Sequence, residues 1–335
     1  METHLKKFNP FLKDTSFVNL MTRRVFNILL VANPYDAFML EDDGRIDEKL
    51  FEEYTRLGLR YPPRFTQVST QDEATRALEQ MRFDLVICMP GTDNSDAFDI
   101  GRDIKMSFPD TPIVVLTPFS HGITRYMERQ DLSLFEYVFC WLGNTELLLS
   151  IIKLIEDKMN LDHDIREGGV QMILLVEDSI RFYSSVLPNL YKYVLEQSRA
   201  FATEALNAHQ ATLRMRGRPK IVLARNYTEA WQLYTTYRNN TLGVISDVRF
   251  PMCDGGPKVS DAGVRLMREI RACDEFLPLI MQSSESIISV CFNSSLLKYG
   301  GDMAVGAMTI LTSVMQFAML PMQGIAQGAQ PILSY

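Results

Sequence analysis

Cysteine is sparse in this sequence and follows no pattern. No pair of cysteines forms a CxxC motif, and no histidine stands at metal-ligand spacing from any of them. An odd, unpatterned set is typical of reduced thiols and argues against a disulfide framework or a structural zinc site. The five residues are Cys88, Cys140, Cys253, Cys273 and Cys291.

Two further absences narrow the class of protein. The chain has no lysine- or arginine-rich block and carries a net charge of −7, so the basic surface of a nucleic-acid-binding protein is missing. The N-terminal stretch METHLKKFNPFLKD lacks the apolar core of a signal peptide. We therefore expect a cytoplasmic protein that does not bind nucleic acid.

The 335 residues are 47% hydrophobic and 22% charged, a globular composition that suffices for two or three domains. Short apolar runs alternate with helical patterns, and this alternation occurs twice along the chain. Continuous apolar strands between helices predict parallel sheets covered on both faces. The expected strands of the first copy are 27–32, 83–89, 112–117 and 136–142, and those of the second are 171–178, 220–224, 242–247 and 278–284.

The fold class predicted is therefore α/β, with two doubly wound parallel-sheet domains and an apolar helical segment at the C-terminus. We expect an N-terminal extension over residues 1–25, a first domain over 26–160 and a polar linker over 161–170. A second domain over 171–284 lacks its fifth strand and last helix. The remaining residues, 285–335, differ in composition from everything before them.

Acidic residues end two strands of the second copy. Glu177 and Asp178 follow the strand 171–178, and Asp247 ends the strand 242–247. In a doubly wound sheet, ligands bind beyond the carboxyl ends of strands where the winding direction switches, so these carboxylates are expected in one crevice. Oxygen ligands suit Mg²⁺, and one carboxylate can then act as a nucleophile towards a phosphoryl group. Alternatively, the acidic residues cap a helix and end a strand at a turn.

The loop after Asp247 sharpens this interpretation. It reads DVRFPMCDG, with Pro251 four residues after the aspartate and then Asp254-Gly255. Together with LLVEDS before it, and GVRLMREIR and PLIMQSS after it, this loop resembles the receiver domains of response regulators. The resemblance covers about residues 171–284, and all four motifs occur in receiver order.

The resemblance implies a role for each matching residue. Asp247 would be the phosphoacceptor, Glu177, Asp178 and Asp247 would hold Mg²⁺ with the main-chain carbonyl of Arg249, and Ser283 would contact the phosphoryl group. The partner would be a histidine kinase or a small phosphodonor, in a signalling protein rather than an enzyme. A phosphatase using Asp247 as nucleophile is disfavoured, because Arg249 occupies the place of a general-acid aspartate.

One part of the receiver pattern is missing. Receivers carry a lysine after strand five that pairs with the phosphoryl group. Lys298 comes too soon after Ser283 and lacks both a strand and the usual following proline. We do not assign it to this role, and we expect phosphorylation to be impaired by the truncation.

The first copy has lost the acidic residues. Ala32-Asn33 replaces the acidic pair and Met89 stands at the phosphoacceptor position, although Thr117 is retained. The fifth strand is followed by Trp141-Leu142-Gly143, without a lysine. Copy one thus resembles a pseudo-receiver used for docking, dimerisation or packing against copy two. Asp93 and Asp96 lie in a loop without an acidic partner on the first strand, so we do not assign them as substitutes.

The C-terminal stretch has a different character. No charge occurs after Asp302, and the segment from Met303 to Leu320 is nearly long enough to span a membrane. KYGGDMAVGAMTI and MLPMQGIAQGAQPILSY resemble the multidrug and toxic compound extrusion (MATE) transporter family. The resemblance implies a transmembrane fragment joined near residue 285, in a chimeric gene product whose residues 287–335 associate with a membrane.

Two alternatives remain beside this interpretation. The C-terminal stretch could instead be an apolar core helix that completes the second receiver. Conversely, the whole product could be a fragment of a drug/cation antiporter with the N-terminal part as an inert fusion. The receiver pair also resembles the N-terminal part of phosphoenolpyruvate synthase-like proteins, but no nucleotide-binding or phosphotransfer domain follows here.

Overall fold

The computed structural model describes residues 17–40, 45–90, 96–118, 134–141, 143–202 and 213–282. The chain divides into two compact units, Met1–Met281 and Gln282–Tyr335. Ser283 and the transporter-like segment 285–335 lie outside the described residues, as does Lys298. Of the helices that the structure does describe, none has the length and apolar character needed to cross a membrane.

Copy one contains a five-stranded sheet, called sheet one, in the order β2-β1-β3-β4-β5. Every neighbouring pair in it is parallel. This is the flavodoxin-like doubly wound order, which confirms the α/β prediction for this part of the chain. The strands are β1 (Asn27–Val31), β2 (Arg64–Val68), β3 (Leu85–Cys88), β4 (Ile113–Pro118) and β5 (Tyr137–Trp141).

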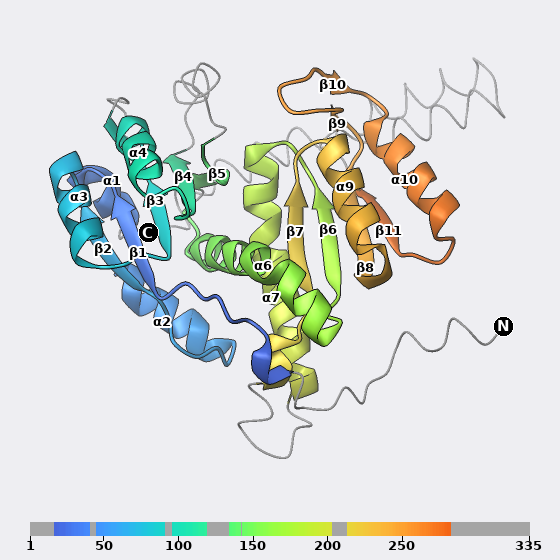
Figure 1. Cartoon of the computed structure of the whole chain (residues 1–335), viewed down its shortest axis with the longest axis horizontal. Helices are drawn as coiled ribbons and strands as arrows, with labels where there is room; N and C mark the ends of the chain where they lie inside the picture. Colours follow the sequence, from blue (N-terminus) through green and yellow to red (C-terminus); the bar gives the residue numbers. More distant parts are fainter. Residues whose placement is uncertain are drawn as a thin grey trace, which may run out of the picture. The chain divides into compact units, whose positions relative to one another are not determined.

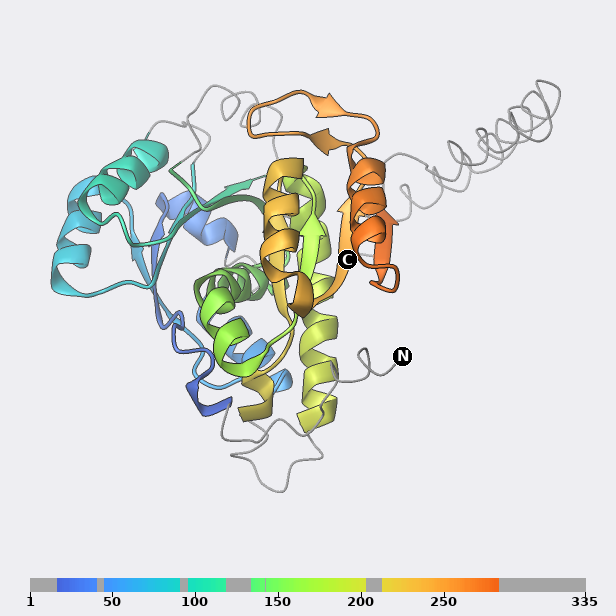
Figure 2. The same ribbon diagram turned by 45° about the vertical axis from the view of Figure 1, so that its right-hand side comes forward.

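Copy two contains a four-stranded sheet, called sheet two, in the order β11-β8-β6-β7. Counted from the start of the copy this is 4-3-1-2, which among the described residues is the winding of the first four strands of sheet one. Its strands are β6 (Met172–Val176), β7 (Lys220–Ala224), β8 (Thr241–Asp247) and β11 (Leu279–Gln282). An antiparallel hairpin of β9 (Phe250–Pro251) and β10 (Lys258–Val259) follows β8, and Figure 2 shows it in orange at one end of the helices beside it.

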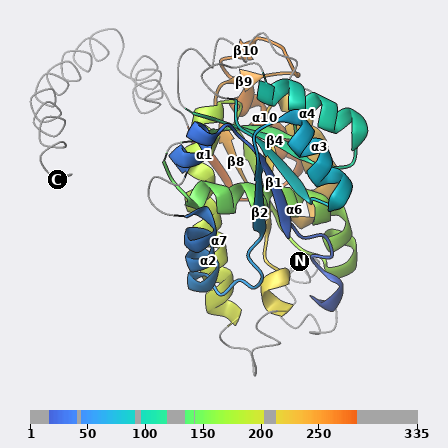
Figure 3. The same cartoon turned by 90° about the vertical axis from the view of Figure 1, so that its left-hand side faces the viewer.

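Helices cover both faces of sheet one. α3 (Gln71–Gln80) and α4 (Asp96–Ser107) pack on one face, while α1 (Pro34–Leu40) and α2 (Ile46–Arg56) pack on the other (Figure 3). α3 begins with a capping box, since Thr70 accepts a bond from the Glu73 amide and Glu73 accepts one from the Ser69 amide. One face of sheet two carries α9 (Tyr227–Tyr237) and α10 (Ala262–Cys273). Short 3-10 turns span Phe17–Asn19 and Arg238–Asn240.

The two copies share one hydrophobic core. α6 (Glu146–Gly168) and α7 (Ile180–Ala202) lie between the two sheets, and buried side chains from both sheets pack on them (Figure 1). α7 also provides hydrogen-bond partners for backbone groups of the outer strand β5. The Tyr183 hydroxyl donates to the Val138 carbonyl, and the Ser184 hydroxyl accepts from the Cys140 amide. The predicted pair of domains is thus a pair of sheets around common helices.

The polar stretch predicted as a linker is helical. Residues 161–168 form the last two turns of α6, which ends at Gly169 in the left-handed conformation with a φ of 59°. Asp164 in this stretch is fully buried, and its carboxylate lies 2.8 Å from the Lys220 ammonium of β7. The polar composition here reflects a buried ion pair with a distant residue, so it does not mark a solvated connection.

The N-terminal strap, residues 20–26, runs along α6 without forming a helix or a strand. Its alternate backbone groups bond to side chains spaced one helical turn apart, which lie on a single face of the helix. The amides of Met21, Arg23 and Val25 donate to Asp164, Asn160 and Glu156, at 3.0, 2.9 and 3.2 Å. The end of the predicted extension is therefore an ordered part of the shared core.

Candidate functional site

Three carboxylates meet at the carboxyl end of sheet two. Glu177 and Asp178 directly follow β6, and Asp247 ends the neighbouring strand β8. The strand register aligns Val176 with Ser246, so the acidic residues after them lie side by side. One oxygen from each carboxylate lies within 4.8 Å of the other two, which is the convergence expected from the sequence.

Glu177 is the most deeply buried of the three, with 2% of its surface exposed. Burial raises its pKa from 4.5 to about 7, and the charges of Asp247 and Asp178 act in the same direction. The Ser179 amide donates to its carboxylate at 3.0 Å, and Lys258 also lowers the pKa, but neither offsets burial. Without a bound cation, Glu177 therefore holds a proton more tightly than a solvated glutamate does.

Asp247 is also buried, and burial raises its pKa above the usual range. The amides of Val248 and Arg249 stabilise its charged form and oppose this shift. The third carboxylate, Asp178, is notable for its hydrogen bonding, because its Oδ1 atom is buried and has no hydrogen-bond partner among the described residues. A buried carboxylate oxygen without a donor needs an explanation, and a hard cation that takes oxygen ligands provides one. The donor set fits Mg²⁺.

Lys258 brings a positive charge to the site from an unexpected part of the chain. It lies on β10 of the hairpin that follows Asp247, and its ammonium is 2.6 Å from Asp178 Oδ2. Its side chain remains 48% exposed. The sequence analysis looked for a cation only after a fifth strand and missed this one. The only local signal was a lysine eleven residues after Asp247, in a loop whose path the pattern does not define.

A glycine at the start of α10 fixes the position of Asp247. The Gly263 amide donates to the Val248 carbonyl at 3.0 Å, which holds the first turn of α10 against the end of β8. A Cβ atom at residue 263 would lie 2.0 Å from the Asp247 carbonyl oxygen, a distance at which backbone must move. The site therefore depends on the absence of a side chain at this position.

The equivalent positions of copy one contain no acidic residue. Val31 pairs with Cys88 as Val176 pairs with Ser246, so Ala32 and Asn33 correspond to the acidic pair and Met89 to Asp247. This register reproduces the alignment made from the sequence. Met89 is 3% exposed and belongs to the core.

The other predicted residues lie partly outside the described structure. Arg249 is exposed and stands two residues after Asp247, where its carbonyl was expected to face the metal. Ser283 and Asp93 lie beyond the described residues, and Asp96 is the first residue of α4. Thr117, expected at the end of the fourth strand, lies within β4 and is buried.

Neither a protein-family model nor a curated protein matches the chain. Several solved structures that resemble parts of the chain are receiver domains or response regulators. One is response regulator TrrA from Thermotoga maritima in complex with Mg²⁺-BeF, at 20% identity and a TM-score of 0.29, over 39% of this chain and 98% of that one. Another is a receiver domain of an HD domain-containing protein from Pseudomonas fluorescens Pf-5, at 14% identity and a TM-score of 0.32, over 43% and 94%.

A third similar structure is the complex of histidine kinase ThkA with TrrA, at 20% identity and a TM-score of 0.29, over 39% of this chain and 97% of that one. All three likenesses are distant. The fold assignment rests on the strand order of the two sheets and on the parallel pairing of sheet one and of β6 with β7 and β8 in sheet two.

Proposed function

We propose that copy two is a phosphorelay receiver in which Asp247 accepts a phosphoryl group. The observation that carries this proposal is the meeting of three carboxylates at the ends of β6 and β8, one of them with an orphaned buried oxygen. Glu177, Asp178 and Asp247 would hold Mg²⁺, with the carbonyl of Arg249 as a further ligand. Bound there, Mg²⁺ supplies positive charge to neutralise the phosphoryl oxygens.

The reaction assigns Asp247 the role of nucleophile. Its ionised carboxylate oxygen forms a bond to phosphorus, and the bond between phosphorus and the donor's leaving atom breaks with its electron pair going to the donor. The donor is a phosphohistidine of a kinase or a small acyl phosphate. The amides of Val248 and Arg249 favour the ionised form of Asp247 against the effect of burial, so they keep the nucleophile available.

Lys258 takes the part of the missing lysine in this proposal. Its ammonium already contacts Asp178, and its half-exposed side chain on a short hairpin has room to turn towards a phosphoryl group on Asp247. A cation next to the three carboxylates also reduces their mutual repulsion before phosphorylation. Under this proposal the missing lysine after strand five need not impair phosphorylation, because Lys258 supplies a positive charge at the site.

Copy one is proposed to be a pseudo-receiver with a structural role. Ala32 and Met89 offer no oxygen ligand and no carboxylate nucleophile. Its helix α6 instead forms the centre of the core shared with copy two. Of the three uses expected for copy one, packing against copy two is the one this arrangement supports.

The test is phosphorylation of the full chain by acetyl phosphate, read by intact mass and by hydroxylamine release of the label. We expect one Mg²⁺-dependent, hydroxylamine-labile phosphoryl group that Asp247→Ala abolishes. Asp99→Ala, which removes an exposed aspartate of α4, is the matched control and should label like wild type. Equal labelling of wild type and Asp247→Ala would show that this proposal is wrong.

A further inference from the structure

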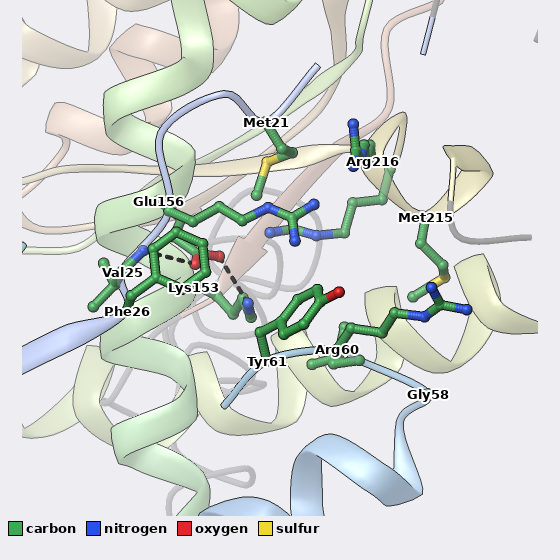
Figure 4. Close-up of a pocket in the computed structure, with 13 residues that line it drawn as sticks. Met21, Val25, Phe26, Gly58, Arg60, Tyr61, Lys153, Glu156, Met215 and Arg216 are labelled. Carbon is green, nitrogen blue, oxygen red and sulfur yellow. Dashed lines mark hydrogen bonds and ion pairs between the residues drawn. The ribbon is translucent and has the colours of Figure 1, made fainter. Parts of the chain in front are cut away.

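A pocket of about 60 Å³ lies where the N-terminal strap, copy one and copy two come together (Figure 4). The strap contributes Met21 and residues 24–26, the loop after α2 contributes residues 58–61, and the turn before β7 contributes residues 215, 216 and 218. α6 closes the pocket with Lys153 and Glu156. The pocket is distant in sequence from the acidic residues of copy two and shares none of them.

The lining is strongly basic, although the chain as a whole has a net charge of −7. Five lining residues are cationic, and Glu156 is the only acidic one. Two of the five are neutralised, because Lys153 lies 2.7 Å from Glu156 and Arg218 lies 2.7 Å from the buried carboxylate of Asp157. Among the described residues, no carboxylate forms an ion pair with the other three guanidinium groups, those of Arg24, Arg60 and Arg216.

The surroundings of these three arginines leave their positive charges uncompensated, which favours binding of an anion. Within the described part of the chain, the side chains of Arg24 and Arg60 make no ion pair or hydrogen bond. Arg216 donates to the Val18 carbonyl at 2.7 Å, but its Nε atom is buried without an acceptor. Burial, and then the nearby charge of Arg24, lower the pKa of Arg216, and an anion between them would reverse both effects.

The backbone around the pocket is also unusual. Met21 and Tyr61 have φ values of 54° and 61°, and in the described residues they are the only non-glycine residues with positive φ. Residues other than glycine rarely adopt this backbone conformation, and such strained residues are concentrated at ligand sites. Tyr61 is 65% exposed and lines the pocket next to Arg60 (Figure 4).

From these observations we infer that the pocket binds the phosphate group of a small phosphorylated ligand. Guanidinium groups match phosphate oxygens in geometry as well as charge. A cavity of about 60 Å³ holds roughly four to six water molecules at about 10–15 Å³ each, which is space for one tetrahedral oxyanion and not for a whole nucleotide. The remainder of a larger ligand would project outwards over the ring of Tyr61.

Such a ligand would hold the two copies together. Arg24 belongs to the strap, Arg60 to copy one and Arg216 to copy two, so one phosphate contacts three separate parts of the shared core. A ligand that binds only this assembled form stabilises it in proportion to ligand concentration. The inference does not rest on phosphorylation of Asp247.

The experiment is a calorimetric titration of the full chain with inorganic phosphate and, separately, with AMP, in buffer with EDTA. We expect saturable binding, at least tenfold weaker in Arg24→Ala and in Arg60→Ala. Arg64→Ala removes a nearby exposed arginine that does not line the pocket, and it should bind like wild type. Arg60 is exposed, so its replacement leaves the fold intact.

The two probes distinguish the two sources of phosphate. Tighter binding of AMP, lost in Tyr61→Gly while phosphate binding is kept, identifies a ring-bearing phosphate ester. Equal affinity for both probes identifies free phosphate. Absence of saturable binding by either probe, or unchanged affinity in both arginine variants, overturns the inference.

Discussion

The buried carboxyl of Glu177 predicts an unusual dependence of stability on pH. Its pKa is about 7 in the folded protein and 4.5 in the solvated reference, chiefly because burial disfavours the charged form. Between these two values the folded state binds the proton more tightly than the unfolded state does, so the free energy of unfolding falls as pH rises. The rise from 4.5 to about 7 corresponds to roughly 3 kcal/mol of stability, which is present in full below pH 4.5 and is lost as the pH rises through 7.

The assay is urea unfolding of the full chain at pH values from 4.5 to 8, with EDTA present. Glu177→Gln mimics the protonated side chain, so it should match wild type at pH 4.5 and exceed it by about 3 kcal/mol at pH 8. Comparing the two proteins at each pH cancels the titration of groups that do not interact with Glu177. Glu79→Gln, at an exposed position of α3, serves as the control and should follow wild type.

Saturating Mg²⁺ should remove the difference. A cation among the carboxylates favours their charged forms, so wild type should gain stability at pH 8 while Glu177→Gln gains less. The reasoning is refuted if wild type and Glu177→Gln differ equally at pH 4.5 and pH 8. It is also refuted if Mg²⁺ stabilises both proteins to the same extent.

Three further outcomes are expected. Asp157→Ala leaves the buried guanidinium of Arg218 unpaired and should lower the free energy of unfolding by about 3–5 kcal/mol in urea, and a loss below 1 kcal/mol would contradict this. Gly263→Ala forces backbone away from Asp247, so unfolding should become about 1–3 kcal/mol easier and Mg²⁺ binding weaker; unchanged calorimetric affinity would count against it. Lys258→Ala should bind Mg²⁺ more tightly, by up to about fivefold, because it removes an ion pair with Asp178 worth about 0.2–1 kcal/mol. It should also accept phosphate from acetyl phosphate more slowly, whereas a purely structural lysine would change both properties in the same direction.

Local pattern predicted the strands of the two sheets apart from β2 (Arg64–Val68). That edge strand escaped prediction because most of its residues are exposed or half-buried, so it lacks an apolar run. The runs 27–32, 171–178 and 242–247 are apolar enough to be buried on both faces, and they form β1, β6 and β8 within one to three residues. The end of each strand then defines where its acidic residues lie, so the meeting of Glu177, Asp178 and Asp247 followed from topology alone.

Long-range pairing is what the sequence could not show. Asp164 looked like part of a solvated linker, because its partner Lys220 lies on a strand of the other copy. Lys258 escaped notice for a similar reason, since only the path of the β9–β10 hairpin brings it to Asp178. The sharing of α6 by two sheets also has no local signature, because a helix that is apolar on several sides resembles any buried helix.

The contact between the N-terminal strap and β7 places a constraint on synthesis of the chain. Met21 touches Lys220, which follows it by 199 residues. At about 5–20 residues per second, a ribosome needs roughly 10–40 s to deliver the second partner after the first. For most of that interval α6 is itself still to be made, so the strap emerges before every partner that it bonds in the folded protein. The strap of a nascent chain therefore stays unpaired until α6 and then β7 have followed it.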